Sequence, residues 1–203
     1  MNLKEPTSLS PFAKIPSVLP WPELFGNTKP LELELGMGRA YYLFERARAT
    51  PDHNIVGIEY KETFVKQALL KKEREQLRNL HAIFGHAWAL VPALFAEESL
   101  CNITFNFPDP WWKKRHRKRR IINSEFLDVL LSKLQTGGTL FLQTDVSALF
   151  EVYLELFKAH PALDTTTHPQ GLLLDNSMQA QSHREKKCLE YGIPIYRALV
   201  IKK

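Results

Sequence analysis

Residues 31–48 read LELELGMGRAYYLFERAR, and this stretch decides the fold class. Leu31–Leu35 has the length and apolar content of a short strand. Gly36 and Gly38 then allow the positive φ angles of a tight turn, and the residues after them predict a helix over 39–48. A strand joined to a helix by a glycine turn is a unit of open α/β sheets, in which ligands bind beyond the strand ends.

The same alternation continues along the chain, with apolar runs that predict strands and helix-periodic stretches between them. A helix beginning near residue 124 is expected to be capped by Asn123 or Ser124 and ended by Gly137 and Gly138. The alternation predicts an α/β fold with a mostly parallel sheet and helices on both faces. The other expected strands are 54–58, 81–84, 101–107, 139–144 and 195–201, and the other expected helices are 62–77, 88–95 and 146–159.

Proline spacing sets the N-terminal part of the chain apart. The first 22 residues contain five prolines, at a spacing that predicts no regular element there. We therefore expect an N-terminal arm over residues 1–30 and a single domain over 31–203. The arm is either an unstructured terminus or a segment that orders on substrate binding. The polar, turn-rich stretch 161–182 receives no prediction.

The positive charge of the chain is concentrated in one segment. The sequence has 27 Lys and Arg against 22 Asp and Glu, a net charge of +5. Seven of these cations lie within residues 113–120, and without them the balance is 20 against 22, or −2. A local positive block favours a docking surface for nucleic acid over a generally cationic protein. A solvated surface run and a localisation signal are the alternative interpretations.

Two further features bear on the cellular setting. Cys101 and Cys188 are isolated, without C-x-x-C spacing or a nearby set of His ligands, so neither a disulfide framework nor a metal site is expected. No signal-peptide pattern is present, and no apolar run approaches the ~18 residues of a membrane span. We expect a cytoplasmic protein with no metal and no membrane contact.

Five polar side chains lie at or just after the ends of predicted strands. Because the carboxyl ends of parallel strands share one edge of a sheet, and ligands bind there, these side chains should gather into one site. They are Glu34, Glu59, His86, Asp109 and Asp145.

The glycine turn and Glu59 together predict a nucleoside site. Glu59 follows a strand about 20 residues after the glycines, where an acid binds ribose hydroxyls. Tyr41 occupies the place of the third glycine of a dinucleotide fingerprint, which disfavours NAD and favours S-adenosylmethionine. Glu34 would complement the ammonium and sulfonium charges of that ligand. Taken singly, the glycines also fit a plain turn, and Glu59 fits a solvated loop carboxylate.

Residues 106–112 read NFPDPWW and run directly into the positive block at 113–120. Two flanking prolines hold the carboxylate of Asp109 stiffly at a strand end. Trp111 and Trp112 can stack on a purine, although Trp112 is also well explained as a core residue. An acid, two indoles and a row of cations in one segment favour a place where nucleic acid is both held and acted on.

Together these segments resemble the bacterial tRNA (guanine-N7)-methyltransferases, over residues 31–201. Pro108–Arg120 matches the specific P-D-P-W-x-K-x-R-H-x-K-R-R run of that family throughout. The resemblance implies a Rossmann-like class I methyltransferase fold that uses S-adenosylmethionine. It also implies methyl transfer to N7 of a guanine in the variable loop of tRNA, which makes tRNA the expected partner.

The resemblance further implies roles for single residues. Asp109 would be both a cofactor contact and the catalytic residue, while Lys113 and Asp145 would contact the substrate. A T-x-x-E element, which reads Ser182 to Glu185 here, would also contact the substrate, although a helix capping box explains these two residues equally well. The full set of implied cofactor contacts is Glu34, Gly36, Gly38, Glu59, His86 and Asp109, and the implied RNA contacts are Arg115, His116, Arg117, Lys118, Arg119 and Arg120.

Two positions depart from the family pattern. His86 stands where the family usually has an acid; a neutral imidazole can still accept from an adenine amino group, but its charge varies with pH. Ser182 replaces the usual Thr and keeps the hydroxyl. Two other functions stay open, a non-enzymatic RNA-binding protein and a methyltransferase acting on another base. The sequence does not distinguish a monomer from a homodimer.

Overall fold

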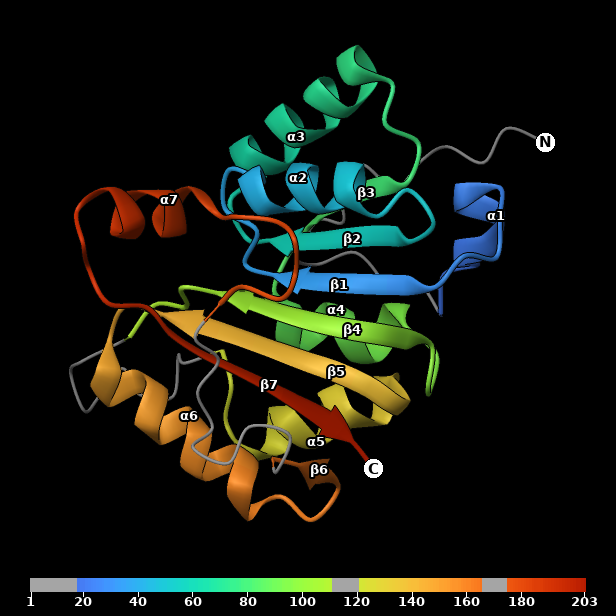
Figure 1. The fold of residues 1–203 in the computed structure, drawn as a ribbon. Coiled ribbons are helices and arrows are strands. Elements are labelled where there is room, and N and C mark those ends of the chain that lie inside the picture. The colour runs from blue at the N-terminus through green and yellow to red at the C-terminus, as the bar shows by residue number, and fades with distance from the viewer. Residues whose placement is uncertain (1–17, 111–120, 166–174) are drawn as a thin grey trace.

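The computed structural model describes residues 18–110, 121–165 and 175–203, which build a seven-stranded sheet covered by helices (Figure 1). The strand order is β3-β2-β1-β4-β5-β7-β6. The strands are β1 (Leu31–Leu35), β2 (Asn54–Glu59), β3 (Leu80–Phe84), β4 (Leu100–Asn106), β5 (Leu134–Thr144), β6 (Leu163–Asp164) and β7 (Tyr196–Lys202). The helices are α1 (Trp21–Phe25), α2 (Tyr41–Ala49), α3 (Glu62–Glu75), α4 (Ala87–Leu94), α5 (Ser124–Lys133), α6 (Ser147–Ala159) and α7 (His183–Glu190).

β1 lies inside the sheet, with β2 and β4 parallel to it on either side. β3 and β5 extend the parallel part, whereas β7 runs antiparallel to β5, and the arrows of these two strands point in opposite directions in Figure 1. The chain thus leaves β1 toward β2 on one side and reaches β4 on the other. Such a reversal of strand order opens a ligand crevice at the carboxyl ends of the strands. The predicted α/β fold with a mostly parallel sheet is confirmed.

The two faces of the sheet differ in chemistry. On one face, alternate residues of β1, β4 and β5 are apolar and belong to the largest core cluster. On the other face, the strand register places Glu34 beside Thr104, and Asn106 beside Gln143. Strands of parallel sheets that are covered on both faces are usually apolar throughout. This face combines these polar side chains with the apolar cluster around Phe141, so its polar residues are the ones to consider for a functional role.

The N-terminal part contains a helix where the prolines predicted none. Trp21 begins α1, and Pro22 is accommodated because the first helical turn has no use for its missing N–H. The Trp21 indole is only 5% exposed, stacks on Phe95 with 5.1 Å between ring centroids, and donates a hydrogen bond to the Leu94 carbonyl. Apolar burial of this one large side chain anchors the end of the expected arm on the core. Residues 1–17 lie outside the described residues.

α5 ends before the glycines that were predicted to end it. Asn123 caps the helix as expected, because its side chain accepts a hydrogen bond from a backbone N–H of the first turn. The helix stops at Lys133, and β5 begins at the fully buried Leu134. Gly137 and Gly138 therefore lie within β5, where its pairing with β4 changes register. The prediction was wrong because it took glycines as helix ends, whereas burial of Leu134 on the sheet ends the helix earlier.

Candidate active site

Glu34 is a buried carboxylate near the carboxyl end of β1, with only 2% of its surface exposed. The amide nitrogen of Asn106 donates to its Oε1 atom at 2.8 Å, while its Oε2 atom is buried and has no partner. Burial raises the pKa of Glu34 to about 8; the Asn106 hydrogen bond opposes this rise and the nearby Glu59 adds to it. A buried carboxylate with an unused oxygen is suited to a cationic ligand, whose charge would favour the ionised form.

The glycine turn after β1 leaves space for a ligand. Gly36 and Gly38 have φ angles of +74° and +53°, which side chains with a Cβ rarely adopt, and no atom lies within 4 Å of where a Cβ would stand. Glu59, at the end of β2, closes the turn, because its Oε2 atom accepts from the backbone N–H of Gly38 at 2.9 Å. Its Oε1 atom accepts from the N–H of Lys61 at 3.0 Å. Each of these oxygens keeps a further lone pair that can accept from a hydroxyl.

His86 follows the third strand end and is exposed. Its ring lies nearly parallel to the exposed ring of Tyr60, at 8° and 6.2 Å between centroids. The backbone joins this segment to the glycine turn, because the N–H of Gly85 donates to the carbonyl of Glu59 at 3.0 Å. Two exposed aromatic rings therefore lie together just after the ends of β2 and β3.

Asp109 is exposed and follows β4, whereas Phe107, Pro108 and Pro110 around it are half-buried. The loop is fixed at its start, because the N–H of Phe107 donates to the carbonyl of Gln143 at 2.8 Å. Phe107 adopts a φ angle of +50°, an uncommon value for a residue with a side chain. Residues held in such conformations cluster at active sites and ligand-binding loops. The two tryptophans and the predicted substrate and RNA contacts that follow Asp109 lie outside the described residues. They are Trp111, Trp112, Lys113, Arg115, His116, Arg117, Lys118, Arg119 and Arg120.

Asp145 follows β5 and is held by Arg184 of α7. The Arg184 Nε atom donates to Oδ2 of Asp145 at 3.0 Å, and a terminal guanidinium nitrogen donates to the same oxygen. Asp145 and Asp109 lie at the same edge of the sheet, since both residues follow the ends of neighbouring parallel strands.

Ser182 and Glu185 form the helix capping box that the sequence left as one of two interpretations. The Ser182 hydroxyl accepts from the backbone N–H of Glu185 at 3.1 Å, and the Glu185 side chain accepts from the N–H of Ser182 at 3.3 Å. Glu185 is fully buried and pairs with Arg197 at 2.9 Å. Its carboxylate also accepts from Asn176 and from Gln143.

The structure thus brings the predicted strand ends to one edge of the sheet, and it adds four residues that the sequence did not single out. Asn106 and Gln143 join Glu34 to Glu185 through hydrogen bonds, and Asn176 and Arg197 donate to the same Glu185 carboxylate. A signal was present for two of them. Asn106 begins the NFPDPWW stretch, and Gln143 immediately precedes Thr144 and Asp145.

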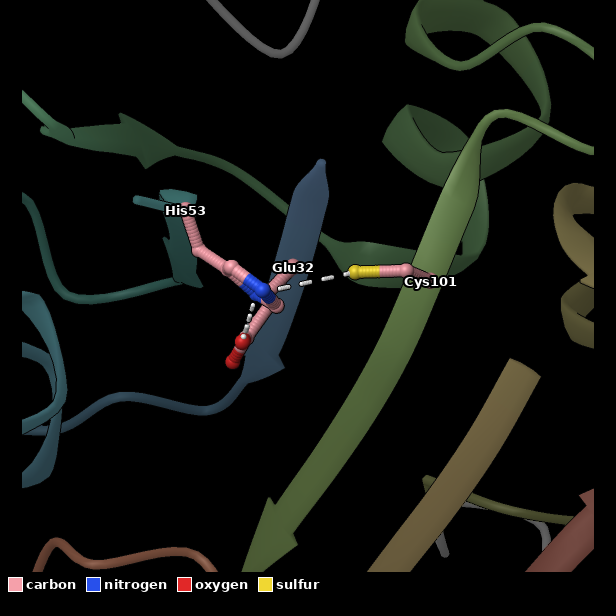
Figure 2. A group of neighbouring side chains, drawn as sticks. All are labelled: Glu32, His53 and Cys101. Carbon is pink, nitrogen blue, oxygen red and sulfur yellow. Dashed lines mark hydrogen bonds and ion pairs between the residues drawn. The ribbon is translucent and has the colours of Figure 1, made fainter. Parts of the chain in front are cut away.

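A second group of polar side chains lies near the amino ends of the strands, away from this site. Figure 2 shows the His53 ring joined both to Glu32 and to Cys101. The Nδ1 atom of His53 lies 2.6 Å from Oε1 of Glu32, and Arg46 donates to both oxygens of the same carboxylate, at 2.7 and 2.8 Å. Three potential metal ligands therefore meet here, but the Arg46 guanidinium already neutralises the only carboxylate among them. The ion pair between Arg46 and the buried Glu32 connects α2 to the sheet, with His53 and Cys101 half-buried beside it.

We expect neither thiol to react readily in the native protein. Burial and the neighbouring Glu32 raise the pKa of Cys101 to about 12, and Cys188 is fully buried. Because the thiolate is the reactive form, a water-soluble disulfide reagent at pH 8 should label both cysteines slowly in the native state and rapidly after unfolding. Labelling of native Cys101 at the rate of a free thiol would contradict this expectation.

Residues 28–198 match a family model described as "Putative methyltransferase". A protein from Synechococcus sp. (strain JA-3-3Ab), named tRNA (guanine-N(7)-)-methyltransferase, is 37% identical over 169 residues, which are 83% of this chain and 71% of the relative. The chain belongs to the tRNA (guanine-N7)-methyltransferase family. A family protein of the same name from Myxococcus xanthus (strain DK1622) is 33% identical over 90% of this chain and 88% of its own. The resemblance inferred from the sequence is confirmed.

Solved structures of other methyltransferases share the family's fold. A 30S ribosomal A1408 methyltransferase from an uncultured bacterium aligns with a TM-score of 0.59 at 16% identity, covering 89% of this chain and 91% of the other. The 16S rRNA methyltransferase KamB aligns with a TM-score of 0.58 at 13% identity, covering 90% and 93%. At such identities the likeness shows the fold alone, and it confirms the Rossmann-like class I architecture. No helix among the described residues is long and apolar enough to cross a membrane.

Proposed function

We infer that this protein is a tRNA (guanine-N7)-methyltransferase, which transfers a methyl group from S-adenosylmethionine to N7 of a guanine in tRNA. The observation that carries this inference is the 37% identity with a relative of that name over 83% of the chain. The PDPW segment at residues 108–111 and the positive block at 113–120 support the same activity. We further propose that the guanine lies in the variable loop and that the protein acts in the cytoplasm, where tRNA is found.

The residues at the carboxyl ends of β1 and β2 fit S-adenosylmethionine. The free Oε2 atom of Glu34 faces no protein partner and would complement the ammonium and sulfonium charges. The turn at Gly36 and Gly38 offers open space, and the Glu59 carboxylate keeps lone pairs for the ribose hydroxyls. His86, beside Tyr60, is proposed to contact the adenine.

The reaction needs alignment more than proton transfer. When bound, the cofactor supplies an electrophilic methyl group on a sulfonium centre. Guanine N7 has an in-plane lone pair and no proton, so the protein needs no general base and acts through orientation and electrostatics. Methylation leaves positive charge on the imidazole part of guanine. A carboxylate at Asp109 or Asp145 would stabilise that charge, and carboxylates also accept from guanine N1–H and N2–H₂, which selects guanine over adenine.

Substrate binding is proposed to involve three parts of the chain. These are the segment after β4, Asp145 after β5, and the start of α7. Lys113 and the cations of 115–120 would contact phosphate, and Asp145 would contact the guanine once Arg184 has moved aside. Ser182 and Glu185 would contribute by holding the start of α7, since their side chains are already bonded to each other's backbone.

The activity is tested by incubating the purified protein with unmethylated tRNA and methyl-labelled S-adenosylmethionine, then digesting the RNA to nucleosides. We expect the label in 7-methylguanosine. Label in an N6- or N4-methylated base would show a methyltransferase of another specificity. Tight tRNA binding without any transfer or cofactor binding would show a non-enzymatic RNA-binding protein instead.

Removing charge from the positive block should weaken tRNA binding and flatten its dependence on salt. In the triple variant Arg117→Ala, Lys118→Ala and Arg119→Ala, up to three phosphate contacts are lost, so the slope of log affinity against log salt should fall by about 0.7 to 0.9 per contact. Binding is measured by filter retention between 50 and 300 mM salt, with Lys66→Ala, an exposed cation of α3, as control. An unchanged slope would reduce the block to a solvated surface run.

A further inference from the structure

A row of polar side chains, all buried except the half-buried Asn106, crosses four strands of the sheet, from the carboxyl end of β1 to β7. Asn106 Nδ2 donates to Oε1 of Glu34 at 2.8 Å. Gln143 Nε2 donates to Oδ1 of Asn106 at 2.7 Å and to Oε2 of Glu185 at 2.9 Å. Gln143 is fully buried, and its Oε1 atom accepts from Nε of Arg197 at 3.2 Å. Every polar atom of the Gln143 side chain is therefore used.

The partners of Gln143 allow only one orientation of its amide. Arg197 has only donors, and the Glu185 carboxylate that pairs with it has only acceptors. A flipped Gln143 would turn its oxygen toward that carboxylate and its nitrogen toward the guanidinium. Since Gln143 must donate toward Asn106, the Asn106 oxygen faces Gln143 and its nitrogen faces Glu34. The ion pair between β7 and α7 thus determines that Glu34 receives a hydrogen bond.

We propose that Gln143 is a positioning residue of the methyl-transfer site. Gln143 fixes Asn106 as a donor to Glu34, and through these hydrogen bonds it connects the Glu34 carboxylate to α7. This inference rests on the proposed function, in which Glu34 faces the cationic part of S-adenosylmethionine. The buried Glu185 then holds one end of this row of hydrogen bonds. It also fixes the start of α7, whose Arg184 donates to Asp145. Binding of the cofactor and placement of α7 depend on the same set of hydrogen bonds.

The donor from Asn106 matters because the other surroundings of Glu34 oppose its ionisation. Burial and the Glu59 carboxylate on β2 raise the pKa of Glu34, and the hydrogen bond from Asn106 lowers it. Tyr42 of α2 also faces this region, but its hydroxyl is paired with Thr104. Without a fixed donor, the carboxylate would ionise at higher pH and would bind a cation less readily.

The test compares Gln143→Met with Asn102→Leu. Asn102 is a matched control, because it is buried on the same face of β4 and its side chain donates to Thr139 of β5 and accepts from Thr104. It lies near the amino ends of the strands and touches neither Glu34 nor Glu185. Binding of S-adenosylmethionine is measured by calorimetry from pH 6 to 9. For Gln143→Met we expect the affinity at pH 7 to be about tenfold weaker, which corresponds to the loss of one hydrogen bond. The pH profile of binding should be displaced to higher pH. Asn102→Leu should leave the affinity within about twofold and the profile in place.

A double-mutant cycle with Asn106→Ala tests whether Gln143 acts through Asn106. If Gln143→Met is poorly folded, Asn106→Ala by itself tests the donor to Glu34, and it should weaken cofactor binding and displace its pH profile to higher pH. Gln143 acts on Glu34 through Asn106, so Gln143→Met should change cofactor affinity little when Asn106 is already Ala. Additive losses, or a Gln143→Met profile equal to that of Asn102→Leu, would overturn the positioning role. Failure of the proposed function is separate, because it would appear in the wild-type protein as no cofactor binding or no 7-methylguanosine.

Discussion

Replacing Glu34 with glutamine is expected to stabilise the ligand-free protein, and to do so more strongly as the pH rises. Burial raises the pKa of Glu34 from the usual 4.5 to about 8. Between these values the unfolded chain is ionised while the folded protein keeps the carboxyl protonated, so the free energy of unfolding falls by up to about 1.4 kcal/mol per pH unit. Glutamine has no such titration. The free energy of unfolding of Glu34→Gln should equal that of the wild type near pH 4.5. The difference should grow between pH 4.5 and 8 and level off above pH 8.

The stability difference is measured by thermal unfolding of both proteins without ligand from pH 4.5 to 8.5. A difference of several kcal/mol corresponds to a rise in Tm on the order of 10 °C for a chain of this length. Glu62→Gln is the control, since Glu62 is a partly exposed residue of α3 whose ion pair with Lys66 lies at the surface. A pH-independent difference between Glu34→Gln and the wild type would show that Glu34 titrates normally in the folded protein.

The same substitution should weaken cofactor binding, and the two effects together distinguish a functional carboxylate from a structural one. A cationic ligand favours ionised Glu34, so binding to the wild type near pH 7 should release a proton and become tighter up to about pH 8. Glu34→Gln should bind S-adenosylmethionine at least about tenfold more weakly and release no proton. Calorimetry in two buffers of different ionisation enthalpy measures both quantities. Equal affinity of the two proteins would remove Glu34 from the cofactor site.

The sequence predicted the sheet and its edge well because those features depend on local patterns. Strand-length apolar runs and helical periodicity located the parallel strands, and strand parallelism alone brings Glu34 and Glu59 to one place. The end of α5 was misjudged because the burial of Leu134 depends on its pairing with a distant strand. The anchoring of Trp21 was missed for the same reason, since its partner Phe95 is far along the chain.

The hydrogen-bonded row was beyond prediction because its members are distant in sequence. The sequence gives no sign that the ion pair between Arg197 and Glu185 fixes the orientation of the side-chain amides of Gln143 and Asn106. Sequence did identify both interpretations of Ser182 and Glu185, and the structure confirmed the capping box. Burial decides such cases, because a fully enclosed carboxylate with four donors around it serves the fold before it can serve a substrate.

Replacing Asp109 with asparagine should slow methyl transfer by about a hundredfold while leaving cofactor and tRNA affinity within a few-fold. The amide keeps the shape of the side chain and removes the negative charge, and preorganised groups that face developing charge contribute on this scale. Asp109 is exposed before the substrate arrives and follows a loop held by the Phe107 N–H, so its substitution should not unfold the chain. The loss should therefore appear in the rate constant of methyl transfer.

Single-turnover kinetics on unmethylated tRNA, at saturating protein and cofactor, isolates the chemical step from binding and product release. Asp52→Asn is the matched control, because Asp52 is equally exposed but lies before β2, at the opposite end of the strands. If charge at Asp109 stabilises the methylated guanine, the defect should be the same on all substrate tRNAs and should persist at saturating substrate. Near-wild-type turnover of Asp109→Asn would show that the charge of Asp109 does not stabilise the methylated guanine, and Asp145→Asn would then be the variant to measure.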